Sequence, residues 1–180
     1  MRGRLDGRSS GQAGFSLPEL LLSAALLGVL AAVSFGSGAE LLARQRVEAT
    51  TRLILEGIQK ARAEAERQGQ ACALSLGEQG WQSPADANLP ACQLALLDLG
   101  ELQQRSQEGQ VQWASNLPAS LRFSANGLVI DGGTVVIWSE RTALRRCLVM
   151  APPLGVLRHG RYSGDLTQPD AASCLREDAA

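Results

Sequence analysis

The feature that most constrains this chain is a long apolar run near its N-terminus that contains one acidic residue. The run extends from Phe15 to Ala39, and Glu19 is its one charged residue. An acid inside a membrane-length apolar segment costs about 2.5–3.5 kcal/mol on insertion scales, so its presence indicates a function. The simplest function is to meet a positively charged partner inside the bilayer or inside an assembly.

The length and the flanks of this run predict a membrane anchor. A helix needs about 20 predominantly apolar residues to cross a bilayer, and residues 15–39 supply that length. Arg2, Arg4 and Arg8 precede the run. Because basic residues tend to stay on the cytoplasmic side, we expect a cytoplasmic N-terminus and an exported remainder.

The junction before the apolar run resembles the class III signal of type IV pilins and type II secretion pseudopilins. In that family a prepilin peptidase cuts after a glycine, the new N-terminal residue is methylated on its nitrogen, and the fifth mature residue is Glu. The corresponding residues here are Gly14, Phe15 and Glu19. Pro18 stands where many members have Thr, and proline is tolerated in the first helical turn.

The resemblance implies how the N-terminal segment works. Residues 1–14 would be a leader that the prepilin peptidase removes, and Glu19 would meet the N-terminal amine of an adjacent subunit. Two opposite charges in a low-dielectric helix bundle are each costly alone and attract strongly together. Such a pair would fix the axial register of the subunits, while the apolar helices supply adhesion.

Two other interpretations of the N-terminus remain open. The first is an ordinary secretory signal peptide, cut after Ser37-Gly38-Ala39, which would release a soluble exported binding domain. The second is a membrane anchor that is never cut. Neither explains the Gly14-Phe15 junction or the position of Glu19.

Residues 40–69 predict an amphipathic continuation of the same helix. Apolar or small residues recur at spacings of three and four, which marks one stripe of a helix. The stripe comprises Val47, Thr51, Ile54, Ile58, Ala61 and Ala65. Gly69 is a plausible stop, because glycine favours the left-handed conformation that ends many helices.

After Gly69 the pattern changes to short strands and turns. The expected strands are 71–76, 91–99, 111–113, 121–123, 128–130, 134–138, 147–150 and, as a last strand or an ordered tail, 155–162. We therefore predict a β-rich domain over residues 70–162 and an acidic tail over 163–180. A long helix followed by a small, mostly antiparallel sheet is an α+β, pilin-like architecture.

The second half of the chain is also similar to the GspH/FimT branch of minor pilins and pseudopilins. This similarity is a pattern of strands and glycines, not of reactive residues. It lies in Leu121–Phe123 with Asn126-Gly127, in Val135–Trp138, and in Arg146–Val149 leading to Gly155–Arg158.

Four cysteines follow the anchor, at Cys72, Cys92, Cys147 and Cys174. An even number in an exported domain is typical of disulfides, and the spacing permits any of the possible pairings. We favour Cys72–Cys92 and Cys147–Cys174, because each pair closes a local loop. A four-cysteine zinc site is disfavoured, because the sequence contains no Cys-x-x-Cys pair.

Residues 141–161 contain five arginines and no acidic residue. Arginine binds phosphate through paired hydrogen bonds, so this stretch is a candidate DNA-binding site. The FimT-type members linked to natural transformation use a C-terminal Gly-Arg-x-Arg element, which Gly155–Arg158 and Gly160–Ser163 each match only in part. The candidate DNA contacts are Arg145, Arg146, Arg158 and Arg161. The alternative is a solvated basic edge, or ion pairs with the acidic tail.

We find no catalytic set in the sequence, and we expect no enzyme, cofactor or metal. The interpretation is a minor pilin or pseudopilin of the inner membrane, which assembles with other pilin subunits into a type IV pilus or a type II secretion pseudopilus. A DNA-binding minor pilin for natural transformation and a soluble exported binding domain are the alternatives.

Overall fold

The structure is a computed structural model of the chain, and it describes residues 16–78, 80–92 and 111–176, with the backbone but not the side chains of 30–37. It divides the chain into two compact units, Met1–Gly38 and Ala39–Ala180. Helix α1, Leu17–Gln68, belongs to both units, and every strand belongs to the second. The second unit combines a helix with antiparallel sheets, which confirms the predicted α+β, pilin-like fold.

The end of α1 is where the sequence predicts it. Gly69 adopts a φ of 62°, the left-handed conformation that a side chain disfavours. Its N–H donates to the carbonyl of Glu66 at 3.2 Å, and the N–H of Gln70 donates to that of Ala65 at 3.3 Å. This is the Schellman arrangement, which satisfies carbonyls that the last helical turn leaves open. The helix begins at Leu17.

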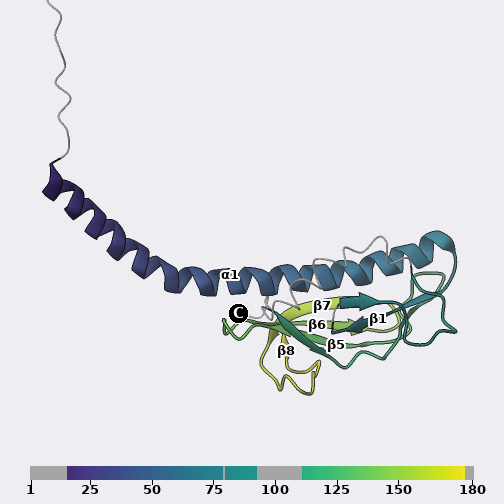
Figure 1. Ribbon diagram of the computed structural model, residues 1–180. Helices are drawn as coiled ribbons and strands as arrows, with labels where there is room; N and C mark the ends of the chain where they lie inside the picture. The colour runs from purple at the N-terminus through teal and green to yellow at the C-terminus, as the bar shows by residue number, and fades with distance from the viewer. Residues whose placement is uncertain (1–15, 79, 93–110, 177–180) are drawn as a thin grey trace, which may run out of the picture. The chain divides into compact units, whose positions relative to one another are not determined.

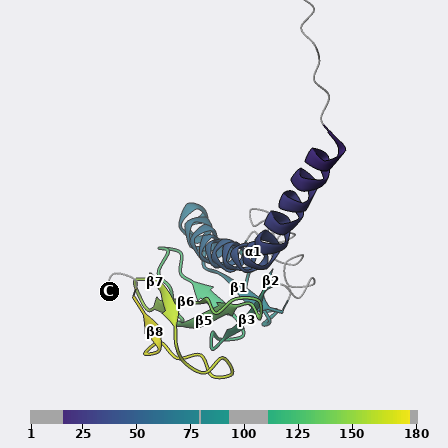
Figure 2. The ribbon, with the colours of Figure 1, turned by 90° about the vertical axis from the view of Figure 1, so that its left-hand side faces the viewer.

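The stripe predicted for residues 40–69 is the face of α1 that the domain buries. Its members are nearly inaccessible to solvent: Val47, Thr51, Ile54, Ile58, Ala61 and Ala65. In Figures 1 and 2 this part of α1 lies along one side of the sheets. The apolar side chains of the stripe, with those of the strands beneath them, form the main core.

The strands form two antiparallel sheets. The three-stranded sheet has the order β2-β1-β4, with β1 at Cys72–Gly77, β2 at Gly80–Gln82 and β4 at Leu121–Phe123. The five-stranded sheet has the order β3-β5-β6-β7-β8. Its strands are β3 Gln112–Ser115, β5 Gly133–Trp138, β6 Arg145–Ala151, β7 Val156–Tyr162 and β8 Cys174–Leu175.

The five-stranded sheet has an apolar cluster on each of its faces. Successive side chains of a strand point to opposite faces, so Leu148 joins the core beneath α1 while its neighbour Cys147 joins a second cluster. The second cluster contains Val136, Tyr162 and Cys174. Cys174 brings β8 into this cluster, so residues that the sequence assigned to an acidic tail form part of the sheet.

One expected strand is corrected by the structure, and another lies mostly outside the described residues. Leu128–Ile130 contributes one isolated antiparallel bridge, between Val129 and Phe123, instead of a strand. In the range 91–99, Ala91 makes one parallel bridge with Ala73, and residues 93–99 lie outside the described part of the chain. Val129 and Ala91 each pair at one position with a residue of a strand, Phe123 of β4 and Ala73 of β1, which the alternation of apolar residues does not reveal.

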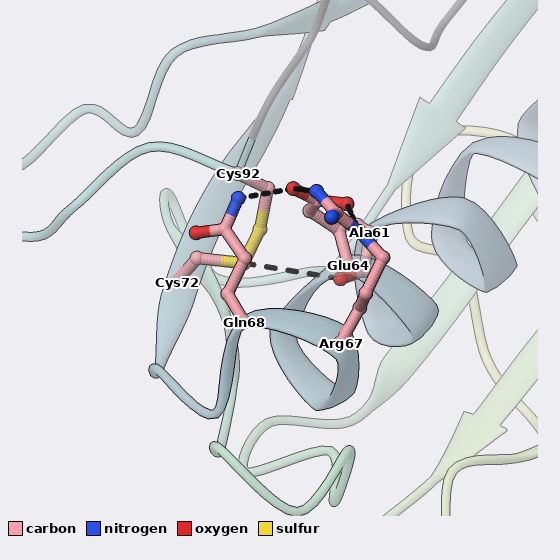
Figure 3. A network of polar contacts seen from close by, with 6 residues as sticks. All are labelled: Ala61, Glu64, Arg67, Gln68, Cys72 and Cys92. Carbon is pink, nitrogen blue, oxygen red and sulfur yellow. Dashed lines mark hydrogen bonds and ion pairs between the residues drawn. A yellow bond between two sulfur atoms is a disulfide. The ribbon is translucent and has the colours of Figure 1, made fainter.

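The structure forms both favoured disulfides, Cys72–Cys92 and Cys147–Cys174. The first lies beside the last turns of α1, where Cys72 Sγ is 3.8 Å from the Ala61 carbonyl oxygen (Figure 3). The second joins β6 to the edge strand β8. In each disulfide the second cysteine, Cys92 or Cys174, is thereby fixed to a strand that packs against the core, β1 or β6.

A carboxylate network closes the same end of α1 (Figure 3). The side chain of Glu64 is only 4% exposed, and it accepts hydrogen bonds from Arg67 Nε at 3.0 Å and Arg67 Nη2 at 2.8 Å. Gln68 Nε2 also donates to Glu64. The hydrogen bonds from Arg67 lower the pKa of Glu64, although burial opposes them. The network links side chains of the last helical turn to one another, directly before Gly69 ends the helix.

The helix and β2 approach each other closely at Gly57. A Cβ atom built there would lie 2.1 Å from Trp81 Nε1, so any side chain would collide with the indole. Trp81 is 3% exposed. Its Nε1 has no hydrogen-bond partner among the described residues, so packing against the bare helix backbone is what holds the ring.

This contact predicts that Gly57→Ala destabilises the second unit by about 1–3 kcal/mol, because overpacking outweighs the gain in helix propensity. The measurement is thermal unfolding of the full chain in detergent. Gly38→Ala is the control: nothing lies within 4 Å of a Cβ built there, so we expect no loss of stability. Equal melting temperatures for Gly57→Ala and the parent would contradict the packing described.

The lowered pKa of Glu64 predicts a pH dependence of stability. A carboxyl group whose pKa is lower in the folded state stabilises the fold above its unfolded pKa, and this stabilisation is lost as pH falls through the folded pKa. We therefore expect the free energy of unfolding of Glu64→Gln to fall less on acidification than that of the parent. Glu66→Gln, which alters an exposed carboxylate 3.7 Å from Arg62, is the matched control and should follow the parent.

Candidate assembly interface

The first turn of α1 places Glu19 at the surface. The N–H groups of Glu19 and Leu20 donate to the Ser16 carbonyl, at 3.0 and 3.1 Å. Glu19 is exposed and is the acid of this turn, where the positive end of the helix dipole favours a negative charge. Gly14 and Phe15, the two residues of the expected cleavage site, lie outside the described residues.

Around Glu19 the helix exposes apolar side chains on all sides. The exposed large ones are Leu17, Leu20, Leu21, Leu22, Leu26, Leu27 and Val29. The hydroxyl of Ser23 donates to the Leu20 carbonyl at 2.9 Å, which satisfies its hydrogen within the helix. A helix that is apolar all round is stable only when lipid or other helices cover it.

No helix in the described part of the chain is both long and apolar enough to cross a membrane. The expected span over residues 15–39 includes residue 15 and the side chains of 30–37, which the structure does not describe.

The four candidate DNA-binding arginines do not form one patch. Strand alternation sends Arg146 and Arg161 to the face of the sheet that α1 covers, where they stand opposite each other on β6 and β7. Arg145 and Arg158 belong to the other face. Arg158 donates to the Ala171 carbonyl at 2.9 Å, so it helps to hold the β7–β8 connection.

Arg146 is instead held against the helix. Its side chain is 11% exposed, and its Nε donates to a carboxylate oxygen of Glu48 at 2.7 Å. Nη2 of Arg146 contacts the same oxygen. An ion pair shielded to this degree contributes mainly by fixing where its partners lie, because desolvation offsets much of the attraction.

This ion pair lies in a groove between α1 and the β6–β7 pair. Glu48 and Arg146 line two adjoining hollows, of about 630 and 390 Å³. Arg52 from the helix lines both; Arg161 lines the larger hollow and His159 the smaller. We call this feature the helix–sheet groove and define it by these five residues.

Sequence reasoning missed the helical half of the groove. Glu48 directly follows Val47, and Arg52 directly follows Thr51, both members of the buried stripe. This spacing could have predicted that Glu48 and Arg52 lie at the border of the covered face. Nothing in the sequence pairs Glu48 with an arginine 98 residues later. In the described residues we also find no group of His, Cys, Asp and Glu side chains placed to hold a metal ion.

Comparison with known proteins identifies the chain's class. Residues 50–153, more than half of the chain, match the family model described as type II transport protein GspH. The chain belongs to the GspH family. Residues 9–35 match the model of the prokaryotic N-terminal methylation motif. No curated protein and no solved structure matches the chain.

These matches extend over both compact units. The methylation motif contains the predicted cleavage junction and Glu19, and the GspH match extends from the middle of α1 through β6. The chain is therefore a pilin-like subunit of the GspH/FimT branch with a prepilin processing motif. Proteins of these families are structural subunits, processed by a prepilin peptidase and assembled with other pilins.

Proposed function

We propose that the chain is a minor subunit of a type II secretion pseudopilus. The precursor is cut between Gly14 and Phe15, Phe15 is methylated, and the mature subunit enters the pseudopilus. The observation that carries this proposal is one exposed acid, Glu19, in an exposed apolar helical segment that lies within the match to the methylation motif. The description of the matching family favours a secretion pseudopilus over a type IV pilus.

The proposed mechanism of assembly is electrostatic. Cleavage creates a positive amine on Phe15, and Glu19 of a neighbouring subunit accepts it within the bundle of apolar helices. Removing one partner of a buried ion pair costs about 3–5 kcal/mol, because the other charge stays buried without compensation. In a subunit that is out of register, the Phe15 amine and the Glu19 carboxylate are both buried without a partner. The ion pair therefore selects one axial position.

The proposed location follows from the same segment. The subunit starts in the inner membrane with its N-terminus in the cytoplasm and its domain on the exported side, consistent with the arginine-rich leader. It then moves from the bilayer into the pseudopilus, where helices of other subunits replace lipid around α1. The two disulfides are compatible with an oxidising compartment.

The first test is the mass of the N-terminal peptide from membrane-extracted protein. We expect a peptide that starts at Phe15 and is heavier by one methyl group. The Gly14→Leu precursor is the control, and it should remain uncut. A start at Glu40 would mean a soluble exported domain, and a start at Met1 would mean an uncut anchor; either result contradicts the proposal.

The second test separates processing from assembly. We expect Glu19→Gln to be cut and methylated normally but to be largely lost from the sheared filament fraction, because no carboxylate meets the Phe15 amine. Immunoblotting of that fraction measures the loss. Glu40→Gln removes an exposed carboxylate that pairs with Arg44, and it should assemble like the parent. Normal assembly of Glu19→Gln would exclude the charge pair.

A DNA-binding role remains a second prediction. Arg145 and Arg161 are exposed, which favours it. The division of the four arginines between two faces of the sheet counts against a single DNA site, and Arg146 and Arg158 already have partners within the domain. Binding of a short oligothymidylate to the purified full chain tests this role directly.

A further inference from the structure

The helix–sheet groove carries more positive than negative charge. Arg146 and Arg161 oppose each other on neighbouring strands, a like-charge arrangement that is unfavourable unless an anion lies between them or beside them. Among the described residues that line the groove, Glu48 is the one acid, and Arg146 forms an ion pair with it.

Two arginines of the groove are left for an outside ligand. Arg52 and Arg161 are both exposed, and neither has an acidic partner within the part of the chain that the structure describes. They come from opposite walls, Arg52 from α1 and Arg161 from β7 (Figure 1). Arginines on two walls of one hollow can grip a carboxylate or phosphate from both sides.

The groove also has an apolar part, formed by leucines that line it together with polar residues such as Gln45 and Thr51. Leu53 and Leu144 line the larger hollow, and Leu55 and Leu148 line the smaller. The described lining contains no Phe, Tyr or Trp on which a nucleobase would stack. A leucine-lined hollow with a basic rim fits a protein segment that combines acidic and aliphatic side chains better than it fits a nucleic acid.

We propose that the helix–sheet groove binds an acidic, partly aliphatic segment of a neighbouring pilin-type subunit. A carboxylate of that segment lies between Arg52 and Arg161, and its aliphatic side chains cover the leucines. Glu48 keeps Arg146 folded against the helix, which leaves the hollow open. This inference rests on the proposed function, since it requires a neighbouring subunit.

The binding test uses the purified full chain in detergent and the fluorescein-labelled peptide Leu-Glu-Glu-Leu, followed by fluorescence anisotropy. We expect the double variant Arg52→Ala/Arg161→Ala to weaken binding about tenfold or more, because it removes both charge-assisted contacts. Arg145→Ala/Arg176→Ala is the matched control: it removes two exposed arginines that do not line the groove, and it should change binding less than about twofold.

Three results would overturn the proposal. Equal weakening by both double variants would mean general charge attraction. Equal affinity for Leu-Gln-Gln-Leu would mean that the groove does not recognise a carboxylate. Tighter binding of a short oligothymidylate, lost in Arg52→Ala/Arg161→Ala, would make the ligand a nucleic acid. Thermal unfolding of each variant verifies that the exposed substitutions leave the fold intact.

A cellular experiment separates this proposal from the proposed function. Arg52→Ala/Arg161→Ala should still yield an N-terminal peptide that starts at methylated Phe15, yet be depleted from the sheared filament fraction. Incorporation at the parent level would overturn the groove proposal and leave the proposed function standing. A parent chain that is itself never cut would instead overturn the proposed function, whatever the peptide binding shows.

Discussion

The second unit, Ala39–Ala180, depends on the burial of one stripe of α1. Val47, Ile54 and Ile58 are among the least accessible residues of the chain, and they lie over the strands that form the main core. Without that stripe the face of the sheets beneath α1 would be uncovered, because the cluster around Cys147 lies on the other side of the five-stranded sheet. The helix thus covers the core of this unit and also continues into the apolar N-terminal segment around Glu19.

The number of charged side chains on the exposed surface of α1 differs between its two parts. The segment around Glu19 exposes leucines and one acid, which suits surroundings that are apolar except for one cation. Beyond Ala39 the exposed positions of the helix carry many charges, and several of them form pairs four residues apart, as Arg44 and Glu40 do. Arg52 is an exception that faces the groove. The same helix therefore combines a packing surface for assembly with an ordinary solvated surface.

Local patterns in the sequence predicted much of this arrangement, and long-range contacts account for the rest. The stripe, the stop at Gly69 and the local disulfide pairs follow from periodicity, backbone preference and loop length, all of which act over short distances. Strands β2 and β8 were missed because they span three and two residues and exist through pairing with β1 and β7. The separation of Arg145 from Arg146 follows from strand alternation, once the bounds of β6 are known. The Glu48–Arg146 pair required the tertiary fold.

The shortness of the edge strands bears on how such a subunit polymerises. At one edge of the five-stranded sheet, β8 has two residues, and the disulfide from Cys174 ties it back to β6. A long, free edge would offer a template on which further chains add strand by strand, as in amyloid. An edge this short offers few backbone groups for such growth. For a pilin-like subunit, so short an edge disfavours polymerisation through its sheets.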